Sequence, residues 1–153
     1  MKVYIGSDHG GFELKEHLKS FIEKLGFQVI DFGTYSQEAV DYPDIAFLVA
    51  EKVSQDKGSL GIMIDGAGMG SAICANKVPG VRAAACYDTY GANNSRQHND
   101  VNLLTLGSMI TGKGLAEQIV KTWLQTSFEG GRHCRRVEKI MAIEKRFLKE
   151  TNL

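Results

Sequence analysis

The sequence predicts a doubly wound α/β fold, in which helices cover both faces of one five-stranded parallel sheet. One regularity of the sequence supports this prediction. Five short apolar runs alternate with segments whose apolar residues recur at helical spacing, and such alternation of strand and helix signals is typical of parallel sheets. The chain of 153 residues shows no linker and no internal repeat, so we expect a single domain over residues 1–153.

Residues 3–6 form the first predicted strand, and a helix follows the polar turn after it. The helix is predicted by an apolar stripe along one face, made of Phe12, Leu14, Leu18, Phe21, Ile22 and Leu25. Gly26 is expected to end this helix, because glycine readily adopts the left-handed conformation with which many helices close.

The next three elements continue the alternation. Residues 27–32 form the second predicted strand. Residues 42–57 form a helix, because Pro43 suits the first turn and apolar residues recur at helical spacing after it. Residues 60–64 are wholly apolar, as strands buried on both faces tend to be.

The second half of the chain follows the same pattern. A glycine-rich loop and a short helix lead to the fourth predicted strand at residues 81–86. Residues 89–97 form a polar helix and residues 101–106 the fifth strand. Apolar residues between Leu115 and Trp123 then mark one more helix.

A further amphipathic helix is predicted after the sheet is complete, at about residues 133–150. Its stripe runs through Val137, Ile140, Met141, Glu144, Phe147 and Leu148. Such a helix can cap its own domain or pack on a partner subunit. We expect the partner, because the sheet needs no further cover and an apolar stripe of this size is rarely left exposed.

Composition narrows the functional class. Lys plus Arg and Asp plus Glu both number 18, so net charge is zero and bulk attraction to nucleic acid or membranes is not expected. No apolar run reaches the roughly 20 residues of a membrane span, and no signal peptide precedes the first strand. Cys74, Cys86 and Cys134 are odd in number and lack metal-binding spacing. We therefore expect a cytoplasmic protein without disulfides or zinc.

Ligands of open α/β sheets bind outside the carboxyl ends of the strands, and polar residues follow the first and third predicted strands. Ser7-Asp8-His9 precedes two glycines and a helix, which suits an anion at the helix N-terminus. The plainer alternative is a helix cap, a role that Ser and Asp often take.

The third strand runs into Asp65 and a loop with Gly66, Gly68 and Gly70, after which a helix begins. Backbone N–H groups of such a loop can point into one concavity, so we expect an anion cradle. The pattern does not predict a dinucleotide site, because it follows the third strand and no acidic residue closes the next one. A glycine loop that only permits tight packing is the alternative.

Two further clusters come later in the chain. His98 and Asn99 stand before the fifth strand, where we expect them to face the glycine loop, although a lone histidine is more often structural. Arg132, Arg135 and Arg136 form the densest basic patch. Arg132 and Arg136 are one helical turn apart, so both can face one phosphate; the alternative is a solvated helix start.

These segments together resemble the ribose-5-phosphate isomerase B and galactose-6-phosphate isomerase family. The resemblance covers nearly the whole chain in the family's order, through Ser7-Asp8-His9, Asp41-Tyr42-Pro43, the glycine loop with Ala75-Asn76-Lys77, Gly80-Val81-Arg82-Ala83, Ser95-Arg96-Gln97-His98-Asn99-Asp100, Gly107-Ser108 and Gly130-Gly131-Arg132-His133. It implies a flavodoxin-like, Rossmann-like fold and an aldose–ketose isomerase of a small sugar phosphate. The reaction implied first is that of ribose 5-phosphate to ribulose 5-phosphate. The resemblance also implies a homodimer, in some members paired into tetramers, with shared active sites and no metal or cofactor.

The resemblance also implies a role for each matching residue. Asp8 and His9 contact the substrate, and Tyr42 lines the sugar site. Substrate binds along the loop, where glycines shape an anion hole for the enediolate; the loop residues are Gly66, Ala67, Gly68, Met69 and Gly70. His98 helps to open the sugar ring and Asn99 binds near the reacting carbons. Arg132 and Arg136 reach the phosphate from the partner subunit.

The chain departs from the family at positions close to the chemistry. The usual base is a cysteine where this chain has Asp65, and some relatives carry a glutamate where it has Ser71. Ala67 replaces a threonine that aids ring opening, and Met109 replaces an arginine that contacts phosphate. Asp65 is then the candidate base, because a carboxylate can take a proton from a carbon next to a carbonyl.

Three functional hypotheses stay open on the sequence. The first is an active isomerase with Asp65 as the base. The second is an isomerase of another sugar phosphate, such as galactose 6-phosphate or a tetrose phosphate; the hydroxyl missing at Ala67 would matter least for a substrate without a stable ring. The third is a catalytically silent sugar-phosphate-binding subunit that needs a partner chain. Cys74, just past the loop, is interpreted as helix packing and not as a relocated base.

Overall fold

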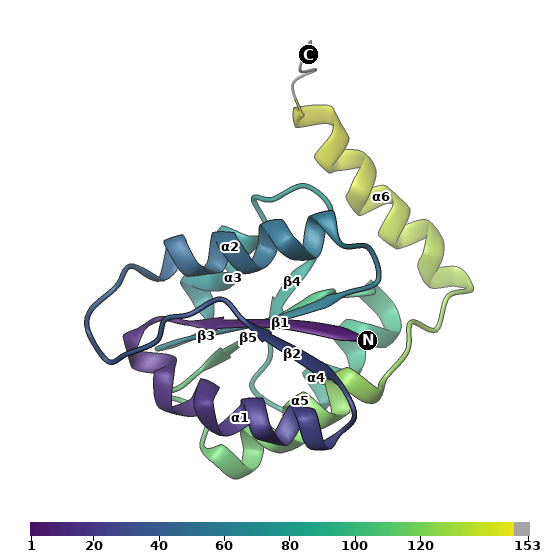
Figure 1. The fold of residues 1–153 in the computed structure, drawn as a ribbon. Coiled ribbons are helices and arrows are strands. Elements are labelled where there is room, and N and C mark those ends of the chain that lie inside the picture. The colour runs from purple at the N-terminus through teal and green to yellow at the C-terminus, as the bar shows by residue number, and fades with distance from the viewer. Residues whose placement is uncertain (149–153) are drawn as a thin grey trace.

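Five parallel strands form one sheet in the computed structural model, which describes residues 1–148 (Figure 1). The strands are β1 Lys2–Ser7, β2 Gln28–Asp31, β3 Leu60–Asp65, β4 Ala83–Ala85 and β5 Leu103–Gly107. Their order across the sheet is β2-β1-β3-β5-β4, and all paired neighbours are parallel. The doubly wound α/β class predicted from the sequence is confirmed. Relative to the flavodoxin order 2-1-3-4-5, the last two strands exchange places.

Helices cover both faces of the sheet. α2 Tyr42–Gln55 and α3 Met69–Ala75 lie above it in Figure 1, and α1 Phe12–Lys24 and α5 Lys113–Gln125 lie below. α4 Thr89–Asn99 packs against α5 on the same side. A short 3-10 helix, η1 His9–Gly11, precedes α1, and α6 Arg132–Phe147 follows α5. In the part of the chain that the structure describes, no helix combines the length and the apolar character needed to cross a bilayer.

The core is divided between the two faces by the strand period of two. Val3 and Ile5 of β1 are fully buried on the side of α1 and α5, and Tyr4 between them is buried on the side of α2. β3 and β5 alternate in the same way. This two-sided burial explains why the sequence of the central strands is nearly continuous in apolar residues.

The last helix stands apart from the rest of the molecule. α6 projects away from the sheet and its flanking helices (Figure 1). Along this helix only His133 is buried, whereas Ile140, Ile143 and Phe147 are 46%, 57% and 83% exposed. Glu144 accepts the N–H of Gly80 at 3.1 Å, so α6 touches its own domain without capping it. The helix begins one residue before the predicted range 133–150 and ends at Phe147; positions 149 and 150 of that range lie outside the described residues.

The direction of winding reverses between β1 and β3. From β1 the chain first adds β2 on one side and then β3 on the other. Ligands of open α/β sheets bind outside the carboxyl ends of the strands at such a reversal. The residues that follow β1 and β3 are those that the sequence singled out, Ser7 to Gly11 and Asp65 to Gly70.

Candidate active site

Asp8 lies at this reversal, between the ends of β1 and β3. Its N–H donates to the carbonyl oxygen of Ile64 at 3.2 Å, which holds the two strand ends together. Its side chain is 9% exposed, and Oδ1 accepts the N–H of Gly11 at 3.0 Å. Asp8 is therefore a cap of η1, as the plainer alternative predicted. Its second carboxylate oxygen has no hydrogen-bond partner among the described residues.

His9 and Tyr42 form the outer rim of the same edge. Nδ1 of the exposed His9 accepts the N–H of Val40 at 3.2 Å. With Nδ1 as an acceptor, the neutral imidazole carries its proton on Nε2 and offers it as a donor. Tyr42 begins α2 and covers Gly70 so closely that a Cβ at position 70 would collide with the tyrosine ring. The absence of a side chain at Gly70 thus lets Tyr42 close over the loop.

Asp65 ends β3 and turns its carboxylate back into the glycine loop. Oδ1 accepts the N–H of Gly68 at 2.6 Å, and Oδ2 accepts the N–H of Ser71 at 3.3 Å. The side chain is only 4% exposed. Gly68 has a φ of 75°, and a Cβ there would lie 3.1 Å from the backbone of Leu106, so both its conformation and its surroundings favour glycine.

These bonds modify the anion cradle that the sequence predicted. The loop does present N–H groups at a helix start, but two of them already hold the Asp65 carboxylate. Among the described residues, the amides of Met69 and Gly70 have no acceptor within the chain. The amides left for a substrate oxyanion are therefore those of the first turn of α3, where the helix dipole also favours negative charge.

Tyr87 is a site residue that the sequence reasoning missed. Its hydroxyl donates to the carbonyl oxygen of Ala67 at 2.6 Å and so fixes the middle of the glycine loop. Burial and the nearby charge of Asp65 raise the pKa of Tyr87, which keeps it a donor. Tyr87 follows shortly after β4, so the rule that ligands gather at strand ends would have identified it.

Two further residues that the sequence analysis singled out, Met109 and Cys74, have clear positions. Met109 is 89% exposed, and its N–H donates to the carbonyl oxygen of Gly66 at 3.0 Å. The Cys74 thiol donates to the carbonyl oxygen of Pro43 at 3.6 Å, and burial together with the charge of Asp44 raises its pKa. A thiol with a raised pKa that packs between α3 and α2 agrees with the packing interpretation of Cys74.

His98 and Asn99 lie at the opposite edge of the sheet. α4 begins after the carboxyl end of β4 and runs antiparallel to the strands, so its last residues precede the amino end of β5. An α-helix of this length spans roughly 16 Å. The expectation that His98 and Asn99 face the glycine loop of their own chain is therefore wrong, because α4 carries them away from it.

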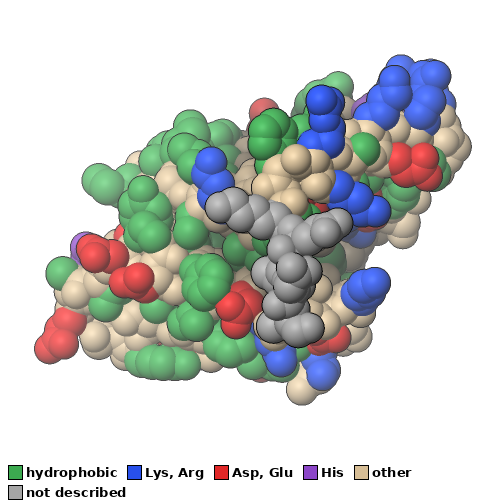
Figure 2. Space-filling view, turned by 90° about the horizontal axis from the view of Figure 1, so that it is seen from above, with side chains coloured by type: hydrophobic (Ala, Val, Ile, Leu, Met, Phe, Trp, Pro, Cys, Tyr) green, Lys and Arg blue, Asp and Glu red, His purple; other side chains and the backbone are tan. Residues whose placement is uncertain are grey.

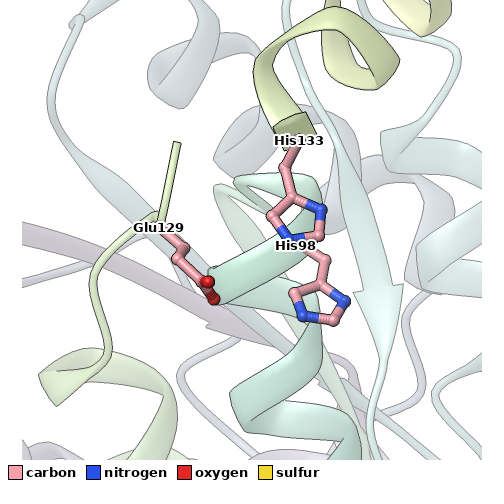
Figure 3. Close-up of side chains that lie close together, drawn as sticks. All are labelled: His98, Glu129 and His133. Carbon is pink, nitrogen blue, oxygen red and sulfur yellow. The ribbon is translucent and has the colours of Figure 1, made fainter. Parts of the chain in front are cut away.

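His98 packs there against His133 and near Glu129 (Figure 3). The two imidazole rings stack with centroids 4.1 Å apart and planes inclined by 13°. The three side chains bring possible ligand atoms within 4.8 Å of one another, as a metal site would. However, stacked rings direct their in-plane lone pairs along parallel planes and not toward one ion, so the arrangement is that of an aromatic pair.

Arg132 and Arg136 extend the same edge. Both are exposed and lie one turn apart at the start of α6, where Figure 2 shows basic side chains gathered at the upper right. Within residues 1–148, no carboxylate lies within 4.0 Å of either guanidinium. An unpaired pair of guanidinium groups is suited to bind a phosphate.

The predicted site residues thus fall into two groups within one chain. The carboxyl-edge group consists of Asp8, His9, Tyr42, Asp65, Gly66, Ala67, Gly68, Met69 and Gly70. The amino-edge group consists of His98, Asn99, Arg132 and Arg136. Because the length of α4 separates the groups, one chain alone does not bring them together.

Comparison with known proteins places these features in a family. Residues 3–140 match the family model described as Ribose/Galactose Isomerase. Ribose-5-phosphate isomerase B of Escherichia coli is 48% identical over 95% of this chain and 97% of its own length. The structure of ribose-5-phosphate isomerase B from Clostridium thermocellum superposes with a TM-score of 0.94 and 53% identity, covering 97% of this chain and 100% of that one. The Mycoplasma genitalium enzyme, solved with bound ribulose 5-phosphate, has a TM-score of 0.90 and 43% identity, covering 94% and 96%.

Proposed function

Because this chain belongs to the ribose/galactose isomerase family, we propose that it interconverts ribose 5-phosphate and ribulose 5-phosphate. The observation that carries the proposal is the arrangement at the end of β3, where a carboxylate lies beside free amides at a helix start. The names of the related enzymes support the pentose phosphate as substrate.

The proposed chemistry is a proton transfer between C2 and C1 of the open-chain sugar. Asp65 takes the proton from C2, the electron pair of that C–H bond forms the C1–C2 double bond, and the C1 oxygen becomes the oxyanion. The amides of Met69 and Gly70 stabilise this charge. The proton then returns to C1 and the O2 proton moves to O1, which leaves a ketone at C2.

Asp65 can serve as this base without leaving the loop. An ionised carboxylate has about four lone-pair positions, and two of those on Asp65 accept N–H groups. The two bonds fix the direction in which the remaining lone pairs point. Since the side chain is 4% exposed, the sugar must approach it past Tyr42, which lies over Gly70 of the loop.

We also propose that the protein is a homodimer in which each site combines groups from two chains. A hollow of about 920 Å³ lies along the edge strand β4, between α4 and the apolar side of α6. Ile140, Ile143 and Phe147 face solvent in the single chain. A second copy that covers them would bring its Arg132, Arg136, His98 and Asn99 to the carboxyl edge of the first. Pairing of such dimers into tetramers is a further option that the resemblance leaves open.

The cytoplasm is the proposed compartment. Cys74, Cys86 and Cys134 are all free, and free thiols are typical of proteins from reducing compartments. The proposed substrate is a phosphorylated sugar, whose charge keeps it from crossing membranes unaided.

A silent binding subunit is the second candidate, and one observation favours it. The Asp65 carboxylate occupies part of the cradle that would otherwise hold the enediolate. If the sugar fails to reach this carboxylate, the chain still has Arg132 and Arg136 for phosphate and would bind without turnover.

A substrate panel distinguishes the candidates. Purified full-length protein would be incubated with erythrose 4-phosphate, ribose 5-phosphate and galactose 6-phosphate, while NMR follows the ratio of aldose to ketose. We expect ribose 5-phosphate to react with the highest kcat/KM. A higher value for a tetrose or hexose phosphate would assign the other substrate, and binding of all three without turnover would establish the silent subunit.

A further inference from the structure

The stacked pair of His98 and His133 supports an inference that rests on the proposed isomerase function and adds a residue to it. We propose that His133 is a positioning residue for sugar-ring opening, whose buried ring face holds His98 in its working orientation.

His98 is held from two sides. Asn94, one helical turn earlier in α4, lies with Nδ2 3.0 Å from Nδ1 of His98. With Asn94 as the donor, Nδ1 accepts and the neutral ring of His98 carries its proton on Nε2. The face of the ring rests on His133 at 4.1 Å. Asn94 thus sets which nitrogen is free, and His133 sets the plane in which that nitrogen points.

His133 is itself immobilised at the start of α6. Its side chain is 3% exposed and its N–H donates to the carbonyl oxygen of Gly130 at 3.1 Å. Glu129 lies four residues before His133, and its N–H donates to the carbonyl oxygen of Gln97 at 3.1 Å. The turn before α6 is therefore tied directly to the last turn of α4, which keeps the two rings in register.

The buried ring of His133 interacts through its flat face and not through hydrogen bonds of its ring nitrogens. Nε2 is buried and has no hydrogen-bond partner among the described residues. Leaving a buried polar atom without a partner is unfavourable by about 1–3 kcal/mol, so a ring selected for its polarity would be expected to have one. The contact that the ring does make is the stack on His98.

The surroundings of His133 disfavour a proton on its ring. Burial, His98, Arg132 and Arg136 all lower the pKa of His133, and only Glu129 opposes them. A neutral ring of His133 therefore stacks on His98 and places no positive charge against it at 4.1 Å.

Ring opening is the one step that uses the Nε2–H of His98. The bond between C1 and the ring oxygen O4 breaks while this N–H donates a hydrogen bond to O4 and stabilises the charge that develops there. Water supplies the proton that O4 takes up, and the proton of the C1 hydroxyl passes to water, so His98 stays neutral throughout. The later transfer between C2 and C1 uses Asp65 and does not involve His98.

The experiment compares His133→Leu with His133→Phe. Both substitutions fill the buried space with an apolar side chain and leave no hydrogen-bond partner unpaired, but only phenylalanine keeps a flat ring under His98. Two rates are measured for each: net conversion of ribose 5-phosphate, and exchange of the C1 protons of ribulose 5-phosphate with D2O, followed by NMR. Ribulose 5-phosphate cannot form a furanose because O5 carries the phosphate, so its exchange needs only the enediolate step.

For His133→Leu we expect net conversion to fall by about 10-fold or more, because a displaced Nε2–H no longer stabilises the charge that develops on O4, while exchange stays within about twofold. His133→Phe should keep both rates within a few-fold of the wild type. His17→Ala, at a half-exposed histidine that pairs with Glu117, is the control and should change neither. Melting temperatures verify that each variant is folded.

Three outcomes overturn the inference: equal loss of conversion and exchange in His133→Leu, wild-type conversion in His133→Leu, or a His133→Phe variant as impaired as His133→Leu. A wild type that neither converts ribose 5-phosphate nor exchanges ribulose 5-phosphate would instead refute the proposed function itself. The two failures are therefore distinct.

Discussion

The Asp65 side chain has two roles: it accepts the N–H groups of Gly68 and Ser71, and it is the proposed base. Asp65→Asn retains the shape and an acceptor for Gly68, but an amide cannot take the C2 proton. We expect kcat to fall by about 10²–10⁴-fold, with ribose 5-phosphate affinity by calorimetry changed only a few-fold. Turnover at the wild-type rate would show that another group is the base.

Asp65→Cys tests the same position from the other direction. A thiol releases the amides of Gly68 and Ser71 and supplies the base that the family resemblance implies at this position. We expect activity to be preserved or raised relative to the wild type, measured as kcat/KM for ribose 5-phosphate. Cys74→Ser is the matched control and should leave activity unchanged, because the Cys74 thiol packs against Pro43 and has a raised pKa.

Arg132 is the second residue whose substitution has a predictable effect, here on substrate affinity. Its guanidinium has no carboxylate partner in the described chain, and Met109 stands where the family resemblance implies another cation. Arg132 is therefore expected to be one of few phosphate contacts. Arg132→Ala should raise KM and Kd for ribose 5-phosphate by an amount equivalent to roughly 2–5 kcal/mol, the range for a desolvated pair of guanidinium and phosphate. Arg146→Ala, near the other end of α6, is the control, and unchanged affinity in Arg132→Ala would show that the phosphate binds elsewhere.

At the scale of elements, the segment after β2 is held over the site by a buried cation. Lys15 of α1 is fully buried, and its Nζ donates to both carboxylate oxygens of Asp31 at 2.8 and 2.6 Å and to the carbonyl oxygen of Thr34 at 2.7 Å. Further along this segment, the N–H of Val40 reaches His9. The ion pair of Lys15 and Asp31 thus anchors the base of the loop that orients His9.

This ion pair predicts a pH dependence of stability. Burial raises the pKa of Asp31, but hydrogen bonds from Lys15, Lys19 and the N–H of Gly33 outweigh it, so the net pKa is lowered. A lowered folded-state pKa means that the stabilisation is present above the unfolded value of about 3.9 and is lost as pH falls through the folded-state pKa. The difference in free energy of unfolding between wild type and Asp31→Asn should therefore be large at pH 7 and shrink on acidification below about 4. Denaturation by urea at several pH values measures it, with the exposed Glu38→Gln as control; a constant difference would contradict the assignment.

α6 carries the next prediction. Truncation after Arg136 keeps the phosphate-binding arginines and removes the exposed Ile140, Ile143 and Phe147. We expect monomers or aggregates by sedimentation, because the apolar groove along β4 loses its cover. A truncation that removes only residues 149–153 is the control. A stable dimer after truncation at Arg136 would show that other surfaces hold the subunits together.

The elements also show which parts of the structure the sequence could predict. The sequence located all five strands and the six α-helices of the described residues but did not predict η1, and Gly26 follows α1 with a φ of 97° as expected. α4 was predicted to stop at position 97 but runs to Asn99, where Asp100 closes it in the left-handed region at φ 48°. The strand order could not be predicted, because the apolar pattern of a strand does not say on which side of the sheet the next crossover returns.

At the scale of the whole molecule, the sequence identified the candidate site residues but could not predict how they lie relative to one another in the fold. Motif spacing does not reveal that α4 carries His98 to the edge opposite Asp65, since this follows from the direction of the helix relative to the strands. It also does not reveal that Asp65 binds the amides of its own loop, because that contact depends on the left-handed turn at Gly68. A twofold dimer resolves the separation, because the same surface of each chain then delivers its amino-edge group to the carboxyl edge of the other.

Mixing two inactive variants tests this shared arrangement. Asp65→Asn damages the carboxyl-edge group and Arg132→Ala the amino-edge group, so each homodimer has two defective sites. In a mixed dimer, one site combines the intact Asp65 of one chain with the intact Arg132 of the other, whereas the second site carries both defects. Random exchange after mild denaturation and refolding should restore about a quarter of wild-type activity at subsaturating substrate, because about half of the dimers are mixed and each has one intact site. The control mixes Asp65→Asn with His9→Ala, which lies on the same edge and therefore should restore nothing. If both groups served the site of their own chain, the first mixture would stay as inactive as its components.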